Sequence, residues 1–238
     1  DRSRSAVVGD RDSDIELANN IGINSFKVSK NGSEKQCWES IMHLLLDDPR
    51  QAHIVRKTSE TNISINVDLD GPAKGEINTG IGFFDHMLEQ LAKHGDFSLL
   101  LNCSGDLHID EHHTVEDVAL ALGEALKEAL GDKRGIQRYG FILPMDESQA
   151  RVTIDLGGRP FSVFQANFPR NEVGGLPTEL VPHFFSSLAE TLGAAIHIEV
   201  EGENSHHMVE SCFKGVARSL RQAFLRDGNE IPSTKGTL

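Results

Sequence analysis

The sequence predicts an α+β protein built from two similar halves of order ββαβα. Two segments carry the evidence, because each pairs adjacent histidines with a downstream glutamate and then continues as an apolar helix: 112–130 and 206–225. A further helix-like segment with one leading histidine precedes each of them, His86 in the first half and His183 in the second. Self-similarity of this length indicates duplication of one supersecondary unit, with the helices gathered on one side of each sheet.

The first half covers about residues 53–132. Alternating apolar residues predict strands and helical periodicity predicts helices, in this order: strands at 54–60 and 62–69, a turn at 70–72, a helix at 82–94, a strand at 97–103 and a helix at 112–130. The last helix is expected to end at Gly131.

The second half covers about residues 136–226 and repeats the pattern with one additional strand. The expected elements are strands at 138–145 and 150–156, an extra strand at 161–168, a helix at 178–192, a strand at 195–201 and a helix at 206–225. Residues 227–238 show no periodicity and are predicted to form a surface arm.

Residues 1–50 differ from the rest and are too few to bury a core of their own. The pattern predicts, in order, a short strand running into an acidic turn at 5–15, a helix at 16–20, a strand at 21–24, a turn at 31–33, a short helix at 38–46 and a linker at 47–50. We therefore expect a separate N-terminal segment, 1–50, and a main domain, 51–238.

Composition excludes several classes of protein. A formal net charge of −13 disfavours nucleic acid and anionic membranes as partners. No stretch approaches the roughly 20 apolar residues that span a bilayer, and no signal-peptide pattern opens the chain. The three cysteines are scattered with no Cys-x-x-Cys, which predicts a reduced, cytoplasmic protein.

The duplicated histidine pairs predict metal binding. Side chains three and four residues apart share a face of a helix, so the pair His112-His113 lies over Glu116, as His206-His207 lies over Glu210. Imidazole and carboxylate together suit a divalent transition metal, and two copies indicate two metals or one site made of two half-sites. The alternative is that these are packed core histidines. The sequence lacks His-Glu-x-x-His, which argues against a zinc protease, and leaves manganese, iron and zinc open.

Further polar side chains are candidates for functional roles. His86, Gln90 and His94 form a polar stripe on an otherwise apolar helix, and Lys214 returns to the face of His207. Three further cations lie among turn-forming residues that suit phosphate capture: Arg138, Arg159 and Lys235. The alternative for each is an ordinary solvated or salt-bridged surface residue.

Four segments closely resemble the imidazoleglycerol-phosphate dehydratases of histidine biosynthesis: Gly80–Leu88, Asp110–Asp117, Gly202–His207 and Ile231–Gly236. The resemblance runs from about residue 53 to the C-terminus. It implies two four-stranded sheets flanking a helical layer, and a homo-oligomer of 24 subunits with two Mn²⁺ ions per active site between subunits. It also implies a carbon–oxygen lyase that converts D-erythro-imidazole glycerol phosphate, a small phosphorylated imidazole, to imidazole acetol phosphate and water.

The same resemblance implies roles for individual residues. The positions that match metal ligands are His86, His112, His113, Glu116, His183, His206, His207 and Glu210. The positions that match substrate contacts are Glu60, Gln90, His94, Arg138, Arg159, Lys214, Ser233 and Lys235.

A dehydration of this kind removes a poorly acidic hydrogen from carbon, so it needs a base. The candidate catalytic carboxylates are Glu60, Glu210 and Asp146, with Glu147 as a further possibility, and Glu60 is favoured as the base. The alternative is that these acids orient ligands or face water. A metal-storage protein would explain the histidines but would leave Arg138, Arg159 and Lys235 without a purpose.

The N-terminal segment Val8–Asp14 resembles the last metal-binding motif of haloacid-dehalogenase-type phosphatases, some of which are fused to bacterial dehydratases as histidinol-phosphate phosphatases. No nucleophilic Asp-x-Asp motif lies upstream of Asp10 in these residues. We therefore expect a phosphatase remnant in which Asp10 and Asp14 are inactive, and histidinol-phosphate phosphatase activity is the alternative function. A chance acidic turn is the other explanation.

Overall fold

The computed structural model describes residues 5–28, 38, 41, 49–226, 228 and 230–238, and the chain divides into two compact units, Asp1–Pro49 and Arg50–Leu238. In the first unit, strand β1 (Ala6–Gly9) pairs in parallel with β2 (Asn24–Lys27), and helix α1 (Asp12–Ile21) packs on both.

Two of the expected boundaries in this unit were wrong. Helix α1 begins at Asp12 rather than residue 16, and the second strand covers 24–27 rather than 21–24. The early start is stabilised by Asp14, whose side chain accepts a hydrogen bond from the Arg11 amide (3.1 Å). Gly22, with a left-handed backbone (φ 74°), ends the helix and delays the strand. The turn at 31–33, the linker residues 47–48 and, apart from Trp38 and Ile41, the helix at 38–46 lie outside the described residues.

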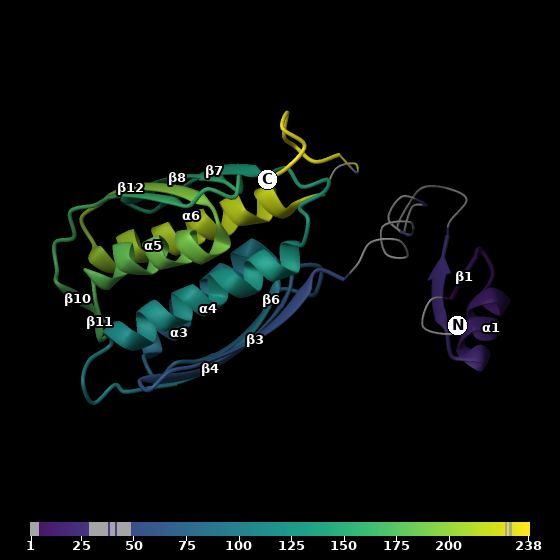
Figure 1. The fold of residues 1–238 in the computed structure, drawn as a ribbon, viewed down its shortest axis with the longest axis horizontal. Helices are drawn as coiled ribbons and strands as arrows, with labels where there is room; N and C mark the ends of the chain where they lie inside the picture. The colour runs from purple at the N-terminus through teal and green to yellow at the C-terminus, as the bar shows by residue number, and fades with distance from the viewer. Residues whose placement is uncertain (1–4, 29–37, 39–40, 42–48, 227, 229) are drawn as a thin grey trace. The chain divides into compact units, whose positions relative to one another are not determined.

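The second unit consists of two four-stranded sheets that enclose a layer of four helices, as Figure 1 shows. The first half contains β3 (Gln51–Lys57), β4 (Thr61–Asp68), β5 (Lys74–Asn78), α3 (Gly82–Gly95), β6 (Ser98–Gly105) and α4 (His112–Leu130). The second half contains β7 (Tyr139–Met145), β8 (Ser148–Asp155), β9 (Phe161–Gln165), α5 (Leu180–Leu192), β12 (Ala195–Glu201) and α6 (Ser205–Phe224). A small hairpin of β10 (Glu172–Val173) and β11 (Leu176–Pro177) precedes α5.

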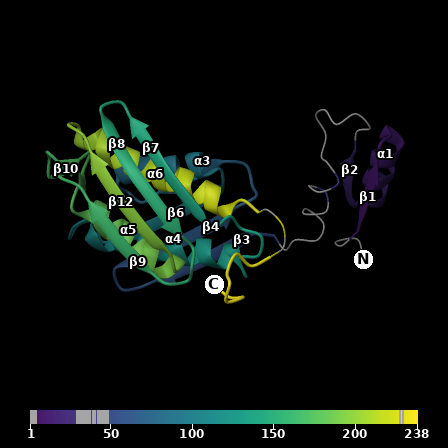
Figure 2. The same ribbon diagram turned by 90° about the horizontal axis from the view of Figure 1, so that it is seen from above.

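The two sheets have the same topology, with strand orders β3-β4-β6-β5 and β7-β8-β12-β9. Figure 2 shows the second of these sheets face on. In each sheet the last strand of the order is parallel to its neighbour, and the other pairs are antiparallel. The α+β class, the duplication and the two four-stranded sheets are therefore confirmed.

Each half has one strand more than the order ββαβα that the periodicity predicted. Strand β5 was missed, and the strand expected as an extra at 161–168 is its counterpart β9. The sequence of β5, Lys-Gly-Glu-Ile-Asn, contains a single large apolar residue, Ile77. It lies at the edge of its sheet, where little burial is required and the apolar pattern is weak.

The core lies between the sheets, where the apolar faces of the four helices meet. Helix α4 packs against α5 and α3 packs against α6. Aromatic rings join the halves: Phe84 of α3 meets Phe184 of α5, which in turn contacts Phe213 of α6. Each such buried side chain stabilises the fold by about 1.5–3 kcal/mol. The core thereby holds the first turns of all four helices in fixed relation.

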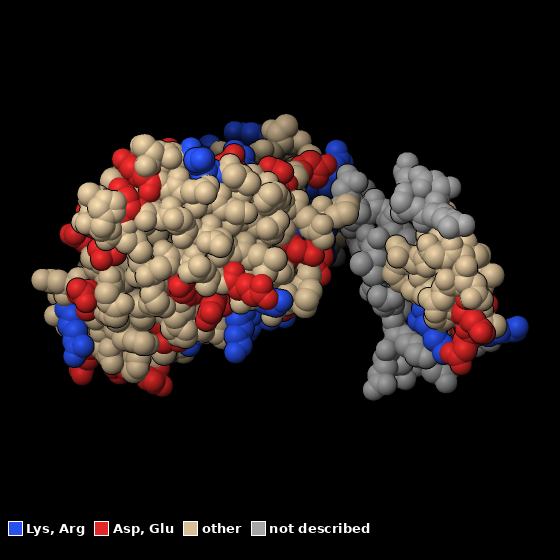
Figure 3. Space-filling view, turned by 90° about the horizontal axis from the view of Figure 1, so that it is seen from below, with Lys and Arg blue, Asp and Glu red and all other residues tan. Residues whose placement is uncertain are grey.

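Asp and Glu outnumber Lys and Arg in this chain. On the face drawn in Figure 3, Lys and Arg are scattered among Asp and Glu, with no extended basic surface among the described residues. None of the helices in the described part of the chain is long and apolar enough to cross a membrane.

At Gly123 helix α4 lies close against the backbone of α5. A Cβ atom at this position would lie 2.8 Å from the Leu188 carbonyl oxygen and 3.0 Å from the Leu192 amide nitrogen. Those are backbone atoms of α5, which cannot move aside as a flexible side chain would.

We predict that Gly123→Ala lowers the free energy of unfolding by about 1–3 kcal/mol, because the added methyl forces α4 and α5 apart. Urea denaturation measures the change. Gly82→Ala is the matched control, since nothing lies within 4 Å of a Cβ there. Equal stability of the two variants would contradict the close packing described for Gly123.

Candidate active site

Both histidine pairs lie in the first turn of a helix, held there by the residue two positions earlier. Asp110 Oδ1 accepts a hydrogen bond from the His112 amide (2.8 Å), and Asn204 Oδ1 accepts one from the His206 amide (2.9 Å). Such side-chain caps satisfy amides that have no partner within the helix. The caps thereby set where each helix starts and which way its histidines face.

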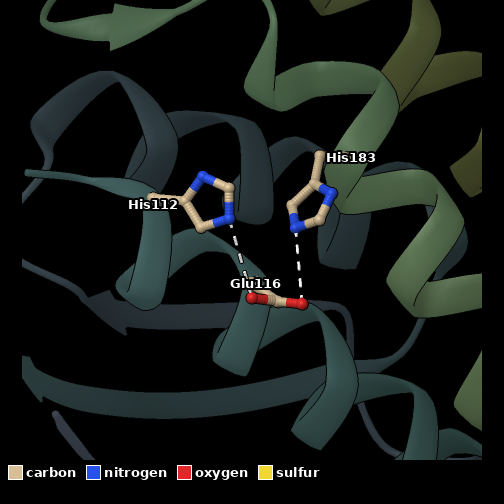
Figure 4. A group of neighbouring side chains, drawn as sticks. All are labelled: His112, Glu116 and His183. Carbon is tan, nitrogen blue, oxygen red and sulfur yellow. Dashed lines mark ion pairs between the residues drawn. The ribbon is translucent and has the colours of Figure 1, made fainter.

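Glu116 joins two helices in the first imidazole–carboxylate group, which comprises His112, Glu116 and His183 (Figure 4). The Nε2 atom of His112, on the same helix α4, lies 3.7 Å from one carboxylate oxygen. The Nε2 atom of His183, on α5, lies 3.5 Å from the other oxygen. The two rings are 4.7 Å apart between centroids. One carboxylate thus faces two imidazole nitrogens, an arrangement in which all three side chains can ligate one cation.

Glu210 forms the second imidazole–carboxylate group, which comprises His86, His206 and Glu210. His206 Nε2, on the same helix α6, lies 3.4 Å from one carboxylate oxygen. His86 Nε2, on α3, lies 4.0 Å from the other. As around Glu116, one carboxylate faces an imidazole of its own helix and one of the facing helix, so the duplication extends from the sheet topology to the candidate ligands, although this second group is more widely spaced.

One nitrogen atom of the first group lacks a hydrogen-bond partner among the described residues. This atom is the buried Nε2 of His183. A buried polar atom without a partner costs about 1–3 kcal/mol. An imidazole nitrogen is a good ligand for a divalent transition metal, so a cation between His112, Glu116 and His183 would supply the missing partner. The residues present therefore fit a metal ion.

The two groups differ in one neighbour. Lys214 lies one turn after Glu210, and its Nζ atom is 2.7 Å from a Glu210 carboxylate oxygen. Burial raises the pKa of Glu210, but Lys214 and the nearby His206 outweigh it and lower the pKa below its ordinary value. The corresponding residue after Glu116 is Leu120, which carries no charge.

The second histidine of each pair points away from its own group. His113 Nδ1 lies 3.0 Å from Asp106, and His207 Nδ1 lies 2.8 Å from Glu147. These hydrogen bonds raise the pKa of both histidines, and the contact with His207 lowers the pKa of Glu147 to about 2. A carboxylate on Nδ1 orients a ring so that its Nε2 atom can bind a metal. His207 also belongs to a further cluster of possible ligands, with Glu147 and Asp146.

Three of the predicted substrate contacts lie beside the Glu210 group. Gln90 and His94 follow His86 along α3, and the Gln90 Oε1 atom lies 3.1 Å from His94 Nε2. Burial, and then the positive charges of Lys214 and Arg218 on the facing helix α6, lower the pKa of His94. The structure therefore brings Gln90, His94 and Lys214 together, in a locally positive environment that suits an anion.

The other predicted phosphate contacts form a separate group around the C-terminal arm. Arg138 donates to the Pro232 carbonyl (2.9 Å) and to both carboxylate oxygens of Asp155 (2.5 and 2.9 Å), which raises the pKa of Arg138. A Cβ at Gly158, next to Arg159, would lie 2.9 Å from the main chain of Leu238. Arg138, Arg159 and the arm that carries Ser233 and Lys235 are therefore neighbours. No hydrogen bond or ion pair among the described residues joins them to either imidazole–carboxylate group.

The candidate bases occupy corresponding hairpins. Glu60 lies between β3 and β4, where its Oε1 atom is 3.7 Å from His113 Nε2. Asp146 and Glu147 lie between β7 and β8, and Asp146 has a left-handed backbone (φ 48°) that turns the hairpin. Each hairpin thus places a carboxylate beside the outward-facing histidine of its own half.

Sequence reasoning missed Asp106 as the partner of His113. It precedes the histidine by seven residues across a loop, and helical spacing rules do not extend into a loop. The only available signal was a carboxylate close in sequence to a predicted metal-binding histidine, since such histidines regularly bond a carboxylate through their second nitrogen.

The fold and the two groups define a class: duplicated α+β proteins with paired imidazole–carboxylate sites at their helix ends. The family model described as imidazoleglycerol-phosphate dehydratase matches residues 79–220, and one described as HAD-hydrolase-like matches residues 1–57. The chain belongs to the imidazoleglycerol-phosphate dehydratase family.

Curated relatives are longer than this chain. It is 53% identical to the histidine biosynthesis bifunctional protein HisB of Stenotrophomonas maltophilia, over all of this chain and 67% of that protein. It is 54% identical to the protein of the same name from Legionella pneumophila, over 98% of this chain and 65% of that protein. The alignment with these bifunctional proteins includes the N-terminal unit.

Solved structures match the second unit. The imidazoleglycerol-phosphate dehydratase of Staphylococcus aureus superimposes with a TM-score of 0.67 and 34% identity, over 74% of this chain and 99% of that one. The enzyme of Pyrococcus furiosus superimposes with a TM-score of 0.68 and 35% identity, over 78% of this chain and all of that one.

We predict that His112→Ala lowers the affinity for divalent metal by at least about tenfold, since loss of even an outer-shell partner costs 10–100-fold. Elemental analysis after dialysis against defined metal concentrations measures the loss. His53→Ala is the matched control, because His53 lies on β3 outside both imidazole–carboxylate groups. Unchanged metal content in His112→Ala would refute the ligand assignment.

Proposed function

We propose that this chain catalyses the dehydration of imidazole glycerol phosphate to imidazole acetol phosphate in histidine biosynthesis. The observation that carries the proposal is the repeated group in which one glutamate faces two imidazole nitrogens from two helices, at 3.5 and 3.7 Å around Glu116 and at 3.4 and 4.0 Å around Glu210. Membership of the dehydratase family supports the same reaction.

We further propose two divalent ions per active site, with manganese as the metal. The ligands would be the eight predicted residues, namely His86, His112, His113, Glu116, His183, His206, His207 and Glu210. Imidazole and carboxylate without thiolate suit this metal. When bound, the ions would supply Lewis acidity toward the substrate imidazole.

The active sites of this proposal lie between subunits of a homo-oligomer, with the 24-mer as the expected assembly. Each imidazole–carboxylate group offers three ligands from one chain, whereas His113 and His207 face away from these groups with Nδ1 bonded to a carboxylate. Those two histidines are available to complete the ligand sets of neighbouring copies. This explains why both are held in orientation by a carboxylate rather than by their own group.

The remaining residues would handle the substrate. Lys214 and His94 near the Glu210 group, and Arg138, Arg159, Ser233 and Lys235 around the arm, would bind the phosphate and hydroxyl groups. Glu60 would accept the proton bound to C2, the hydroxyl-bearing carbon between the ring-bearing carbon and the phosphate-bearing carbon. The hydroxyl beside the ring would leave as water, and the resulting enol would become the ketone. In this proposal Glu210 and Asp146 orient the reacting groups of the substrate.

The two cysteines that the structure describes agree with a cytoplasmic location. Cys103 and Cys212 are buried and unpaired, and burial raises the pKa of both thiols, to about 11 for Cys103. Unpaired, unreactive thiols suit a reducing compartment.

A direct assay tests the function. Purified protein reconstituted with manganese is offered imidazole glycerol phosphate or histidinol phosphate, and ketone and inorganic phosphate are measured separately. We expect ketone from the first substrate, because residues 79–220 match the dehydratase family model. Phosphate release from histidinol phosphate would support the alternative function for the N-terminal unit, and absence of ketone would refute the dehydratase.

Lys235→Ala is predicted to raise KM by about tenfold, the effect of losing one charge-assisted hydrogen bond of 1.5–3 kcal/mol, with kcat and metal content preserved. Steady-state kinetics and elemental analysis measure the three quantities. Lys127→Ala, an exposed lysine on α4, is the matched control. Loss of metal in Lys235→Ala would show that the arm belongs to the metal site instead.

A further inference from the structure

We infer that Asp117 is a positioning residue that locks the Glu60 hairpin onto helix α4, and so places Glu60 for the reaction. The inference rests on the proposed function and deepens it. It concerns a residue next to Glu116 in sequence whose side chain faces the opposite direction, into the first sheet.

Asp117 is 7% exposed and accepts hydrogen bonds from three residues of the β3–β4 hairpin. Arg56 reaches one carboxylate oxygen through Nε (3.1 Å) and Nη2 (3.0 Å). The hydroxyls of Thr61 (2.5 Å) and Thr58 (3.4 Å) reach the other oxygen. A buried carboxylate with this many donors is held in one orientation.

Thr58 transmits that orientation to Glu60. Its hydroxyl oxygen accepts hydrogen bonds from the backbone amides of Glu60 (3.1 Å) and Thr61 (2.9 Å). The backbone of Glu60 is therefore two hydrogen bonds away from Asp117. The Glu60 side chain is itself 46% exposed, so the hairpin backbone rather than packing must set its direction.

The lock fixes Glu60 relative to the candidate ligands. Asp117 follows Glu116 directly, and both belong to the first turns of α4 together with His113, whose Nε2 atom lies 3.7 Å from Glu60 Oε1. A movement of the hairpin would change that distance while the ligands on α4 stayed in place. Asp117 and the candidate ligands His113 and Glu116 lie on the same part of α4, so a hairpin bonded to Asp117 keeps Glu60 at a fixed distance from those ligands.

The second half of the chain shows that the fold does not require this lock. Ser211 occupies the position that corresponds to Asp117, and its hydroxyl donates to Met208 within its own helix (2.8 Å). The β7–β8 hairpin is attached instead through Glu147, which accepts from the Asn204 amide (3.2 Å). Since the two halves share one topology, a purely structural need for Asp117 would have a counterpart at Ser211. The halves differ in how the hairpin carboxylate is held: Glu147 bonds His207 directly (2.8 Å), whereas Glu60 lies 3.7 Å from His113 and depends on its hairpin for its position.

The test removes one link at a time in the full chain loaded with manganese. Thr58→Val deletes the hydroxyl at constant shape, and Thr58→Ser keeps it as the conservative variant. We expect Thr58→Val and Asp117→Asn to lower kcat by about 10–100-fold, the effect of a small misplacement of a reacting group, with KM and metal content unchanged. Thr58→Ser should recover kcat to within about twofold of the parent, because the hydroxyl is retained.

A double-mutant cycle with Glu60→Gln separates positioning from stability. If Asp117 and Thr58 act through Glu60, then Thr58→Val lowers kcat no further in the Glu60→Gln background. Independent, multiplying effects would overturn the inference, as would a loss of metal or of folded protein that parallels the loss of kcat. Wild-type kcat in Glu60→Gln would overturn it as well, while leaving the dehydratase itself intact. Failure of the parent chain to form ketone would instead refute the proposed function.

Discussion

Two glutamates, Glu116 and Glu210, each lie between an imidazole of their own helix and an imidazole of the facing helix. This geometry requires α4 to pack closely on α5, and α3 on α6, with their first turns level. Gly123 permits α4 to pack closely on α5. The aromatic contacts among α3, α5 and α6 stabilise the packing of α3 and α6. The sheets, the caps at Asp110 and Asn204 and the buried helix faces all serve to keep these four helix ends together.

Duplication produced two similar groups that have since acquired different surroundings. The Glu210 side chain is nearly buried and forms an ion pair with Lys214. The Glu116 side chain is more exposed, and the residue one turn after it is the uncharged Leu120. The first half attaches its hairpin through Asp117, and the second through Glu147. Such differences allow similar ligand sets to perform distinct tasks, one nearer the anion-binding side chains of α3 and α6, the other nearer Glu60.

Sequence periodicity was sufficient for the elements that are strongly amphipathic, and insufficient where burial is slight. Helix α4 and strand β12 were predicted with their observed boundaries, because capping residues and alternating apolar residues mark both ends. Edge strand β5 was not predicted, and the start of α1 was predicted four residues too late. For the site, spacing along one helix predicted His112 with Glu116 and His206 with Glu210. The pairing of Glu116 with His183, and of His113 with Asp106, depends on tertiary contacts that no local spacing encodes.

The buried Nε2 atom of His183, which makes no hydrogen bond within the part of the chain that the structure describes, has a thermodynamic consequence. A group that is desolvated on folding without gaining a bond destabilises the native state, and the unfolded chain, where water solvates the ring, carries no such penalty. A cation that binds the native arrangement and not the unfolded one shifts that balance by mass action, in proportion to the logarithm of its free concentration. The melting temperature would then rise with the concentration of free metal.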